Sequence, residues 1–151
     1  KNGCVLLNMI AKSNGEIPDG VRQRLLEMGE WLSLNGEAIY GTRPFVIYGE
    51  GPSEVVEGHL SEIENPDATA QDIRFTTKDG FLYAYVMAPP ETTLKISSLG
   101  LKKTNVQPVK SIILLGTKEP LKWKQSQDML SIKCPEKLPF GNVNTFKVEF
   151  K

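Results

Sequence analysis

Residues 73–87 read IRFTTKDGFLYAYVM and give the clearest structural signal in the chain. Residues 73–77 alternate between apolar and polar side chains, as a half-buried strand does, and the Asp79-Gly80 pair that follows is typical of a β-hairpin tip. The return strand, residues 81–87, has apolar side chains on both of its faces. We therefore expect an antiparallel hairpin whose second strand lies in the middle of a sheet.

Further strands follow at short intervals, each bounded by turn residues. The expected strands are residues 94–96, 112–115, 121–124, 129–133 and 145–150. With the hairpin they make about seven or eight strands, a number typical of an antiparallel two-sheet β-sandwich over residues 73–151. An immunoglobulin-like adhesion domain is a further alternative, but it would carry a Cys…Trp…Cys spacing that the sequence lacks.

The first 44 residues have a different pattern. Residues 4–7 form a short apolar run that is typical of a strand buried on both faces. A helix is expected from Pro18, which suits a first helical turn, to Asn35, where Gly36 would adopt the left-handed conformation that ends a helix. Its apolar stripe consists of Val21, Leu25, Met28 and Leu32.

A strand followed by a helix is half of a βα unit, so residues 4–7 would have lost their neighbours. We interpret the chain as a C-terminal piece of a longer protein. Three outcomes stay open for residues 4–7: they are disordered, they lie against the helix, or they pair with a second copy of the chain. Self-association of the truncated chain is thus one of the expectations.

The formal charge is zero, with 18 basic and 18 acidic residues, but it is unevenly distributed. Residues 45–72 contain seven acids and no Lys or Arg, whereas residues 73–151 contain 13 basic and six acidic residues. The chain therefore divides into residues 1–44, an acidic linker or crossing at 45–72, and the sandwich at 73–151. Opposite charges predict that the crossing lies along the sandwich or beside the helix.

Two classes of partner are excluded by composition. A zero net charge argues against a nucleic-acid binder, because neutralising phosphates takes a surplus of Lys and Arg. No apolar run approaches the roughly 20 residues of a membrane span. We expect neither nucleic acid nor a membrane as a partner.

Several stretches carry a family resemblance. They are residues 1–8 (KNGCVLLN), the helix from Ile17 to Leu32, residues 35–44 (NGEAIYGTRP), residues 72–80 (DIRFTTKDG), residues 114–116 (LLG) and residues 121–124 (LKWK). Together they resemble the α-L-fucosidases of glycoside hydrolase family 29, in which the end of a (β/α)8-like catalytic barrel is followed by a C-terminal β-sandwich. The chain departs from the family at residues 9–12, where many members have a Gly-Pro pair.

The resemblance implies a parent enzyme that removes terminal α-linked L-fucose from glycoconjugates with retention of configuration. Such chemistry needs two carboxyl groups about 5 Å apart, and in this family both precede residues matching this chain. We therefore expect no catalytic residue here, an inactive fragment, and a sandwich that buttresses the barrel, through which the fucosylated glycan would bind. The alternative is a non-catalytic carbohydrate-binding sandwich. We expect no cofactor and no metal, and family members are commonly exported or lysosomal.

Asn8 is the one candidate substrate-binding residue. The active site of a barrel enzyme lies at the C-terminal ends of the strands, and Asn8 follows the expected strand at residues 4–7, so it could line the rim of a fucose pocket. The alternative is a side chain that only ties the loop backbone.

Other residues with chemical potential have ordinary structural explanations. We expect Glu27 with Glu30, and Glu62 with Glu64, to be solvated surface acids. His59, the single histidine, is expected in a turn, Trp31 and Tyr40 are expected where helix and sandwich meet, and Trp123 should pack in the core with Lys122 and Lys124 pointing the other way. Cys4 and Cys134 could form a disulfide, but two buried free thiols are the favoured interpretation.

Overall fold

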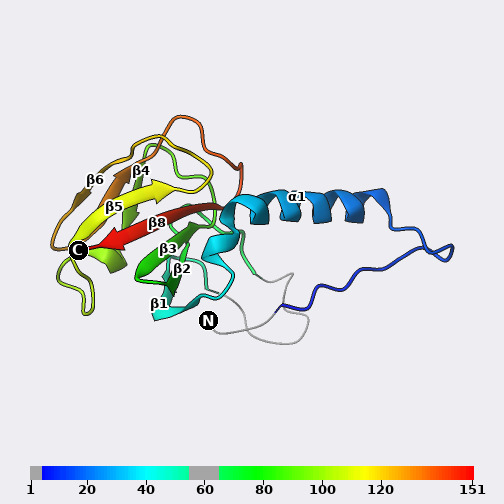
Figure 1. The fold of residues 1–151 in the computed structure, drawn as a ribbon, viewed down its shortest axis with the longest axis horizontal. Helices are drawn as coiled ribbons and strands as arrows, with labels where there is room; N and C mark the ends of the chain where they lie inside the picture. The colour runs from blue at the N-terminus through cyan, green and yellow to red at the C-terminus, as the bar shows by residue number, and fades with distance from the viewer. Residues whose placement is uncertain (1–4, 55–64) are drawn as a thin grey trace.

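Two antiparallel β-sheets make up most of the structure, a computed structural model that describes residues 5–54 and 65–151 (Figure 1). The larger sheet contains, in spatial order, β1 (Arg43–Glu50), β2 (Ile73–Lys78), β3 (Phe81–Val86), β8 (Asn144–Phe150) and β5 (Val109–Leu114). The smaller sheet contains β4 (Thr93–Ile96), β7 (Leu130–Lys133) and β6 (Lys122–Gln125). The prediction of a mainly β chain with an antiparallel sandwich is confirmed.

The hairpin of β2 and β3 has the predicted form. Lys78 pairs with Phe81, and the two residues between them, Asp79 and Gly80, have φ angles of 51° and 82°. Two consecutive left-handed residues are what a two-residue type I′ turn requires, which explains the Asp-Gly pair. β3 lies between β2 and β8, in the middle of its sheet as expected.

The inner faces of the two sheets close over one apolar core. Fully buried side chains there include Leu82, Ile96, Leu130, Ile132, Phe146 and Val148. On β6, Trp123 packs against this core while Lys122 and Lys124 are exposed, as the alternation of the sequence predicts.

β1 corrects the expectation that residues 45–50 begin a crossing. They form an edge strand that pairs with β2, Arg43 opposite Thr77 and Gly49 opposite Arg74, with an irregular register between Pro44 and Gly49. The irregularity removes the two-residue period that would have shown in the sequence. The division of the chain into three parts stays a prediction.

Helix α1 (Asp19–Asn35) has nearly the predicted bounds and continues into a 3₁₀ turn, η1 (Gly36–Ala38). Gly36 was expected to adopt the left-handed conformation, but its φ of −59° is right-handed, so this expectation is wrong. Its lack of a side chain matters instead through contact: a Cβ there would come within 2.7 Å of the Tyr40 ring. The left-handed glycine that turns the chain is Gly41, with a φ of 71°.

The predicted strand at residues 4–7 is wrong for its described part. Residues 5–12 have no regular secondary structure, and Val5 and Leu6 are 91% and 96% exposed. A strand needs a hydrogen-bonded neighbour, and none of the strands in the described residues pairs with this segment. Residues 5–18 loop out beyond the N-terminal end of α1 (Figure 1).

Candidate functional site

The C-terminal end of α1 and η1 dock on the outer face of the larger sheet, and this contact is called the seam below. Four buried residues form its centre, and four partly buried ones surround them. They are Ala38, Tyr83, Tyr85 and Leu115, surrounded by Trp31, Phe81, Met87 and Val143. The second apolar face of β3, which marked it as a central strand, is therefore covered by the helix end.

Hydrogen bonds fix the position of η1 on the sheet. The Ala38 carbonyl accepts from the Tyr85 hydroxyl and from Thr76 Oγ1, the latter at 2.9 Å. Burial raises the pKa of Tyr85 to about 12, so its hydroxyl keeps its proton and remains a donor. Trp31 adds a bond from Nε1 to the Val143 carbonyl at 2.8 Å.

An ion pair closes the other side of the seam. Lys147 Nζ lies 2.8 Å from Glu37 Oε2 and 4.3 Å from the centre of the Phe81 ring. Although burial lowers the pKa of Lys147, its hydrogen bonds and charge interactions with Glu37 and Tyr83 together outweigh this, and the net direction is upward. The pair joins residues far apart in the sequence, so it holds the helix end against β8.

A largely apolar groove of about 670 Å³ runs along the seam between α1 and the sheet. Met28, Trp31 and Ile39 line its helix side, and Tyr85 and Met87 line its sheet side. The charged residues in its lining are Arg24, Glu27 and Arg74. A single carboxyl group beside two cations does not provide the pair that glycoside hydrolysis needs, so this groove is suited to apolar contact.

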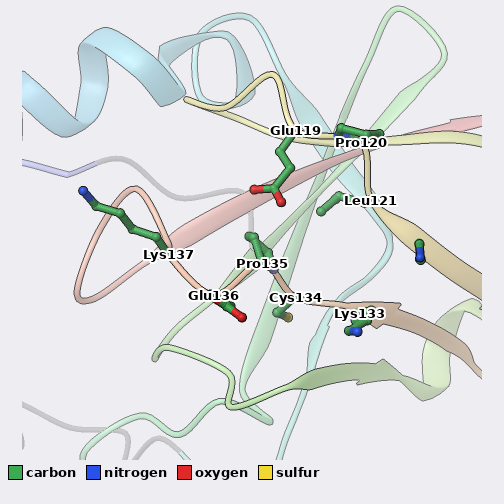
Figure 2. Close-up of a pocket in the computed structure, with 9 residues that line it drawn as sticks. Glu119, Pro120, Leu121, Lys133, Cys134, Pro135, Glu136 and Lys137 are labelled. Atoms are coloured by element: carbon green, nitrogen blue, oxygen red, sulfur yellow. The ribbon is translucent and has the colours of Figure 1, made fainter.

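A second hollow, of about 490 Å³, lies between the turn before β6 and the end of β7 (Figure 2). Glu119, Lys133, Glu136 and Lys137 line it together with Cys134. Cys134 is buried and free, as expected, and burial raises the pKa of its thiol, so it remains in the unreactive protonated form. Cys4 lies outside the described residues.

Asp72 is the most strongly held acid in the described chain. It is fully buried and accepts four hydrogen bonds, from the backbone N–H and hydroxyl of Ser53 (3.0 and 2.7 Å) and of Thr69 (2.8 and 2.7 Å). Burial raises the pKa of Asp72, but the hydrogen bonds outweigh it and hold the pKa well below its ordinary value. Asp72 thus ties Ser53 and Thr69 to the start of β2.

Glu50 and Asp72 contact residues of the sandwich, whereas the attraction of the whole crossing to Lys and Arg stays a prediction. Glu50 accepts hydrogen bonds from the backbone N–H groups of Ser97 and Ser98, at 2.8 and 2.5 Å, and Asp72 is satisfied by Ser53 and Thr69. Both carboxylates are satisfied by uncharged donors and not by Lys or Arg. Most other acids of the crossing, Glu62 and Glu64 among them, lie outside the described residues, as does His59.

The remaining predicted residues have mixed outcomes. Glu27 is exposed and bonds to Gln23 and Arg24, which lower its pKa, and Glu30 is exposed too, so this pair is solvated as predicted. Trp31 lies in the seam, but Tyr40 is 59% exposed, because its ring packs over Gly36 and not against the sheet. Asn8 lies in the segment without secondary structure, and its substrate-binding role stays a prediction.

Within residues 5–54 and 65–151, no helix combines the length and apolarity required to traverse a bilayer. In the same ranges, His, Cys, Asp and Glu side chains nowhere gather in threes as a metal ion would need.

The fold and the seam define a two-sheet β-sandwich with a helix docked on the outer face of its larger sheet. A family model described as the alpha-L-fucosidase C-terminal domain matches residues 65–149, and one described as alpha-L-fucosidase matches residues 1–37. The chain belongs to the α-L-fucosidase family.

Individual proteins agree with this assignment. The tissue alpha-L-fucosidase of Rattus norvegicus is 31% identical over 97% of this chain and 27% of its own length. The tissue alpha-L-fucosidase of Homo sapiens is 29% identical over 91% of this chain and 25% of its own length. The crystal structure of Thermotoga maritima alpha-fucosidase with a mechanism-based inhibitor superposes with a TM-score of 0.68 at 27% identity, covering 95% of this chain and 29% of that one. The chain thus spans about a quarter of the length of these curated relatives.

Proposed function

We propose that this chain is the C-terminal part of a retaining exo-α-L-fucosidase, in which the sandwich serves as a structural buttress of the catalytic barrel. The observation that carries the proposal is the seam. It joins α1, within the segment that matches the alpha-L-fucosidase model, to the sheet that matches the C-terminal domain model. A buttress requires such a fixed joint, and Trp31, Glu37 and Ala38 supply it through side-chain and backbone bonds to the sheet.

The other side of α1 supports the same function. Leu26 and Leu34 are exposed on the helix, although apolar side chains on a helix face favour burial against a partner. In the proposal the barrel covers these residues. When the chain is produced alone they are free to cover one another, so we also propose that it self-associates.

The fragment is proposed to be inactive. A glycosidase acid catalyst needs a raised pKa, so that it is protonated when the leaving group departs. Within the described residues, every carboxyl group with a shifted pKa has it lowered by neighbouring hydrogen-bond donors. These groups are Glu27, Asp72, Asp128 and Glu149. The catalytic pair would therefore lie in the barrel.

Hydrolysis of 4-nitrophenyl α-L-fucoside tests the proposal. We expect no turnover by this chain, and turnover with retention of configuration by a full-length protein that contains it. Turnover by the chain alone would disprove its inactivity, and an inactive full-length protein would disprove the fucosidase assignment.

Isothermal titration of the chain with fucosylated oligosaccharides tests the buttress role separately. We expect no heat of binding, because Phe75, Tyr83 and Phe146 are buried and cannot stack on sugar rings. Saturable binding would instead establish the carbohydrate-binding module.

A further inference from the structure

The outer face of the smaller sheet carries four lysines and is called the lysine face below. It consists of Lys95 on β4, Lys133 on β7, and Lys122 and Lys124 on β6. All four are exposed, and the residues that alternate with them, such as Leu94 and Ile132, are buried in the core. The strand register places Lys122 opposite Lys133, and places both Lys95 and Lys124 opposite Ser131.

This arrangement is unfavourable in the isolated chain. Directly opposed residues on one face of an antiparallel pair have their Cβ atoms about 5 Å apart, and like charges there are destabilising. Within the described residues, none of the four lysines has a carboxylate within ion-pair distance. The four ammonium groups repel one another, and among the described residues no direct ion pair offsets this repulsion.

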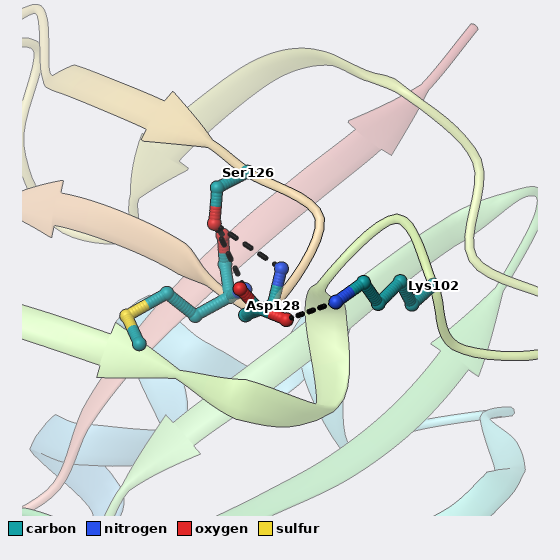
Figure 3. A network of polar contacts seen from close by, with 4 residues as sticks. Lys102, Ser126 and Asp128 are labelled. Atoms are coloured by element: carbon teal, nitrogen blue, oxygen red, sulfur yellow. Dashed lines mark hydrogen bonds and ion pairs between the residues drawn. The ribbon is translucent and has the colours of Figure 1, made fainter.

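Three other lysines of the sandwich are paired. Lys102 bonds to Asp128 at 2.8 Å, in the turn where Ser126 holds the backbone (Figure 3), and Lys110 bonds to Glu149 at 2.7 Å. Lys147 is paired with Glu37 in the seam. Lys103, Lys118 and Lys137 have no ion pair among the described residues either, but they lie outside the strands, whereas the four lysines of the lysine face lie together on one sheet.

We propose that the lysine face binds an anionic polysaccharide, a linear glycan that carries repeated sulfate or carboxylate groups. Neighbouring strands lie about 4.8 Å apart, so the four ammonium groups form a compact, flat patch that an extended chain of anions can cover. Thr93 and Ser131 lie on the same face and offer hydroxyl groups for hydrogen bonds to the glycan. Binding would release the counterions condensed on the polymer, as for other polyanions.

The face is less suited to other polyanions. Trp123, the aromatic residue of β6, packs toward the core and cannot stack on a base, and the four cations are all Lys, which lacks the fork that reads phosphates and guanine. No exposed apolar side chain lies among them on the three strands for insertion into a membrane. The choice of a glycan among polyanions also rests on the proposed function, since a fucosidase works on glycans.

The hollow of Figure 2 limits one end of the face. Lys122 and Lys133 line this hollow, and so do Glu119 and Glu136. These two carboxylates repel an anion there. The glycan would therefore lie from the Lys122–Lys133 pair toward Lys124 and Lys95.

Titration of this 151-residue chain into fluorescently labelled heparin, followed by anisotropy over a series of salt concentrations, tests the proposal. We expect binding that weakens with salt, and none to neutral dextran. The double variant Lys122→Gln/Lys133→Gln should bind roughly tenfold more weakly or worse, and its slope of log affinity against log salt should fall by about two. The matched control Lys102→Gln/Lys110→Gln removes as many charges from paired lysines and should lose less than about twofold.

Several outcomes would overturn the proposal. These are no binding of heparin, an equal loss in the two double variants, or tighter binding of single-stranded DNA or phosphatidylserine vesicles than of heparin at equal charge concentration. Thermal unfolding of the Lys122→Gln/Lys133→Gln variant separates a loss of binding from a fold defect. Its melting temperature should be unchanged or raised, because the substitutions remove opposed like charges. The measurement involves no hydrolysis, so its failure and the failure of the fucosidase assignment are distinguishable.

Discussion

In the β-sandwich, Leu82 and Phe146 are buried between two sheets, whereas Leu26, in the N-terminal arm formed by residues 5–30, is 53% exposed. Both regions are rich in apolar side chains. The sandwich consists of regular strands, and the arm contains most of helix α1 and the segment for which a strand was expected. The difference is that each sheet of the sandwich packs against a second sheet, whereas among the described residues the first of the arm and helix to join a buried cluster is Trp31 in the seam. The apolar pattern thus predicts which face of an element favours burial, but the face is buried only where another element packs against it.

Truncation of a core side chain should break the comparison most strongly. Phe146→Ala should lower the free energy of unfolding by about 3–5 kcal/mol, because a fully buried ring leaves a cavity. Leu26→Ala, the matched truncation in the arm, should change it by less than about 0.5 kcal/mol. Urea denaturation measures both. A large loss for Leu26→Ala would mean that the arm is packed after all.

Variants of Asp72 test whether its hydrogen bonds to Ser53 and Thr69 stabilise the start of β2. Asp72→Ala should lower the free energy of unfolding by about 3 kcal/mol at neutral pH, because it leaves the donors of Ser53 and Thr69 unpaired. The pKa of Asp72 is lower in the folded than in the unfolded state, so its stabilisation is present above the unfolded value of about 4 and is lost as pH falls below it. Unfolding in urea from pH 7 to pH 2.5 measures this dependence.

The control for Asp72 is Asp67→Asn, because Asp67 is an exposed acid five residues before Asp72 in the sequence. That variant should keep the wild-type acid dependence, whereas Asp72→Asn should flatten it. An unchanged acid dependence in Asp72→Asn would contradict the role assigned to the four hydrogen bonds.

Trp31 lies at the boundary between the two regions and sharpens the comparison there. Trp31→Phe keeps an aromatic ring beside Tyr85 but removes the donor to the Val143 carbonyl, so it should cost about 1–2 kcal/mol. Equilibrium unfolding gives the loss, and near-ultraviolet circular dichroism reports the change around Tyr85. Leu26→Ala serves again as control on the same helix. A cost below that of Leu26→Ala would show that the seam does not depend on this bond.

The smallest expected effect is a gain. Lys122→Glu should raise the free energy of unfolding by about 0.2–1 kcal/mol, because it replaces a like-charge pair with an ion pair to Lys133. Lys124→Glu, opposite Ser131, is the control and should gain less. Thermal unfolding at low salt detects the difference. A loss of stability in Lys122→Glu would contradict the assigned register or the repulsion.

Much of the sandwich could be predicted because its signals are local. The Asp79-Gly80 turn, the two apolar faces of β3 and the alternation around Trp123 each follow from a few neighbouring residues. β1 was missed because its irregular pairing with β2 erases the period. The burial of Asp72 was missed because its donors, Ser53 and Thr69, are defined only by tertiary structure.

The errors at the N-terminal end have a different origin. Residues 5–7 have the composition of a buried strand, and nothing local distinguishes a strand with neighbours from the same residues without them. Gly36 was assigned a left-handed role from its place after the helix, whereas its function is to make room for the Tyr40 ring. Asn8 lies in the same segment, so its expected place at the end of a strand is not formed among the described residues.

The position of β8 has a consequence for how the protein is made. Ala84 on β3 pairs with Phe146 on β8, and β8 also pairs with β5, so a strand close to the C-terminal end of the sequence lies inside the larger sheet. Such long-range pairing slows folding, because the loop between the strands must close first. During synthesis β2 and β3 emerge before β8, so β3 has no partner on its other side until residues 144–150 follow. The Val143 carbonyl and Lys147, which bind Trp31 and Glu37, are also synthesised last, so the end of helix α1 gains these contacts only when β8 is present.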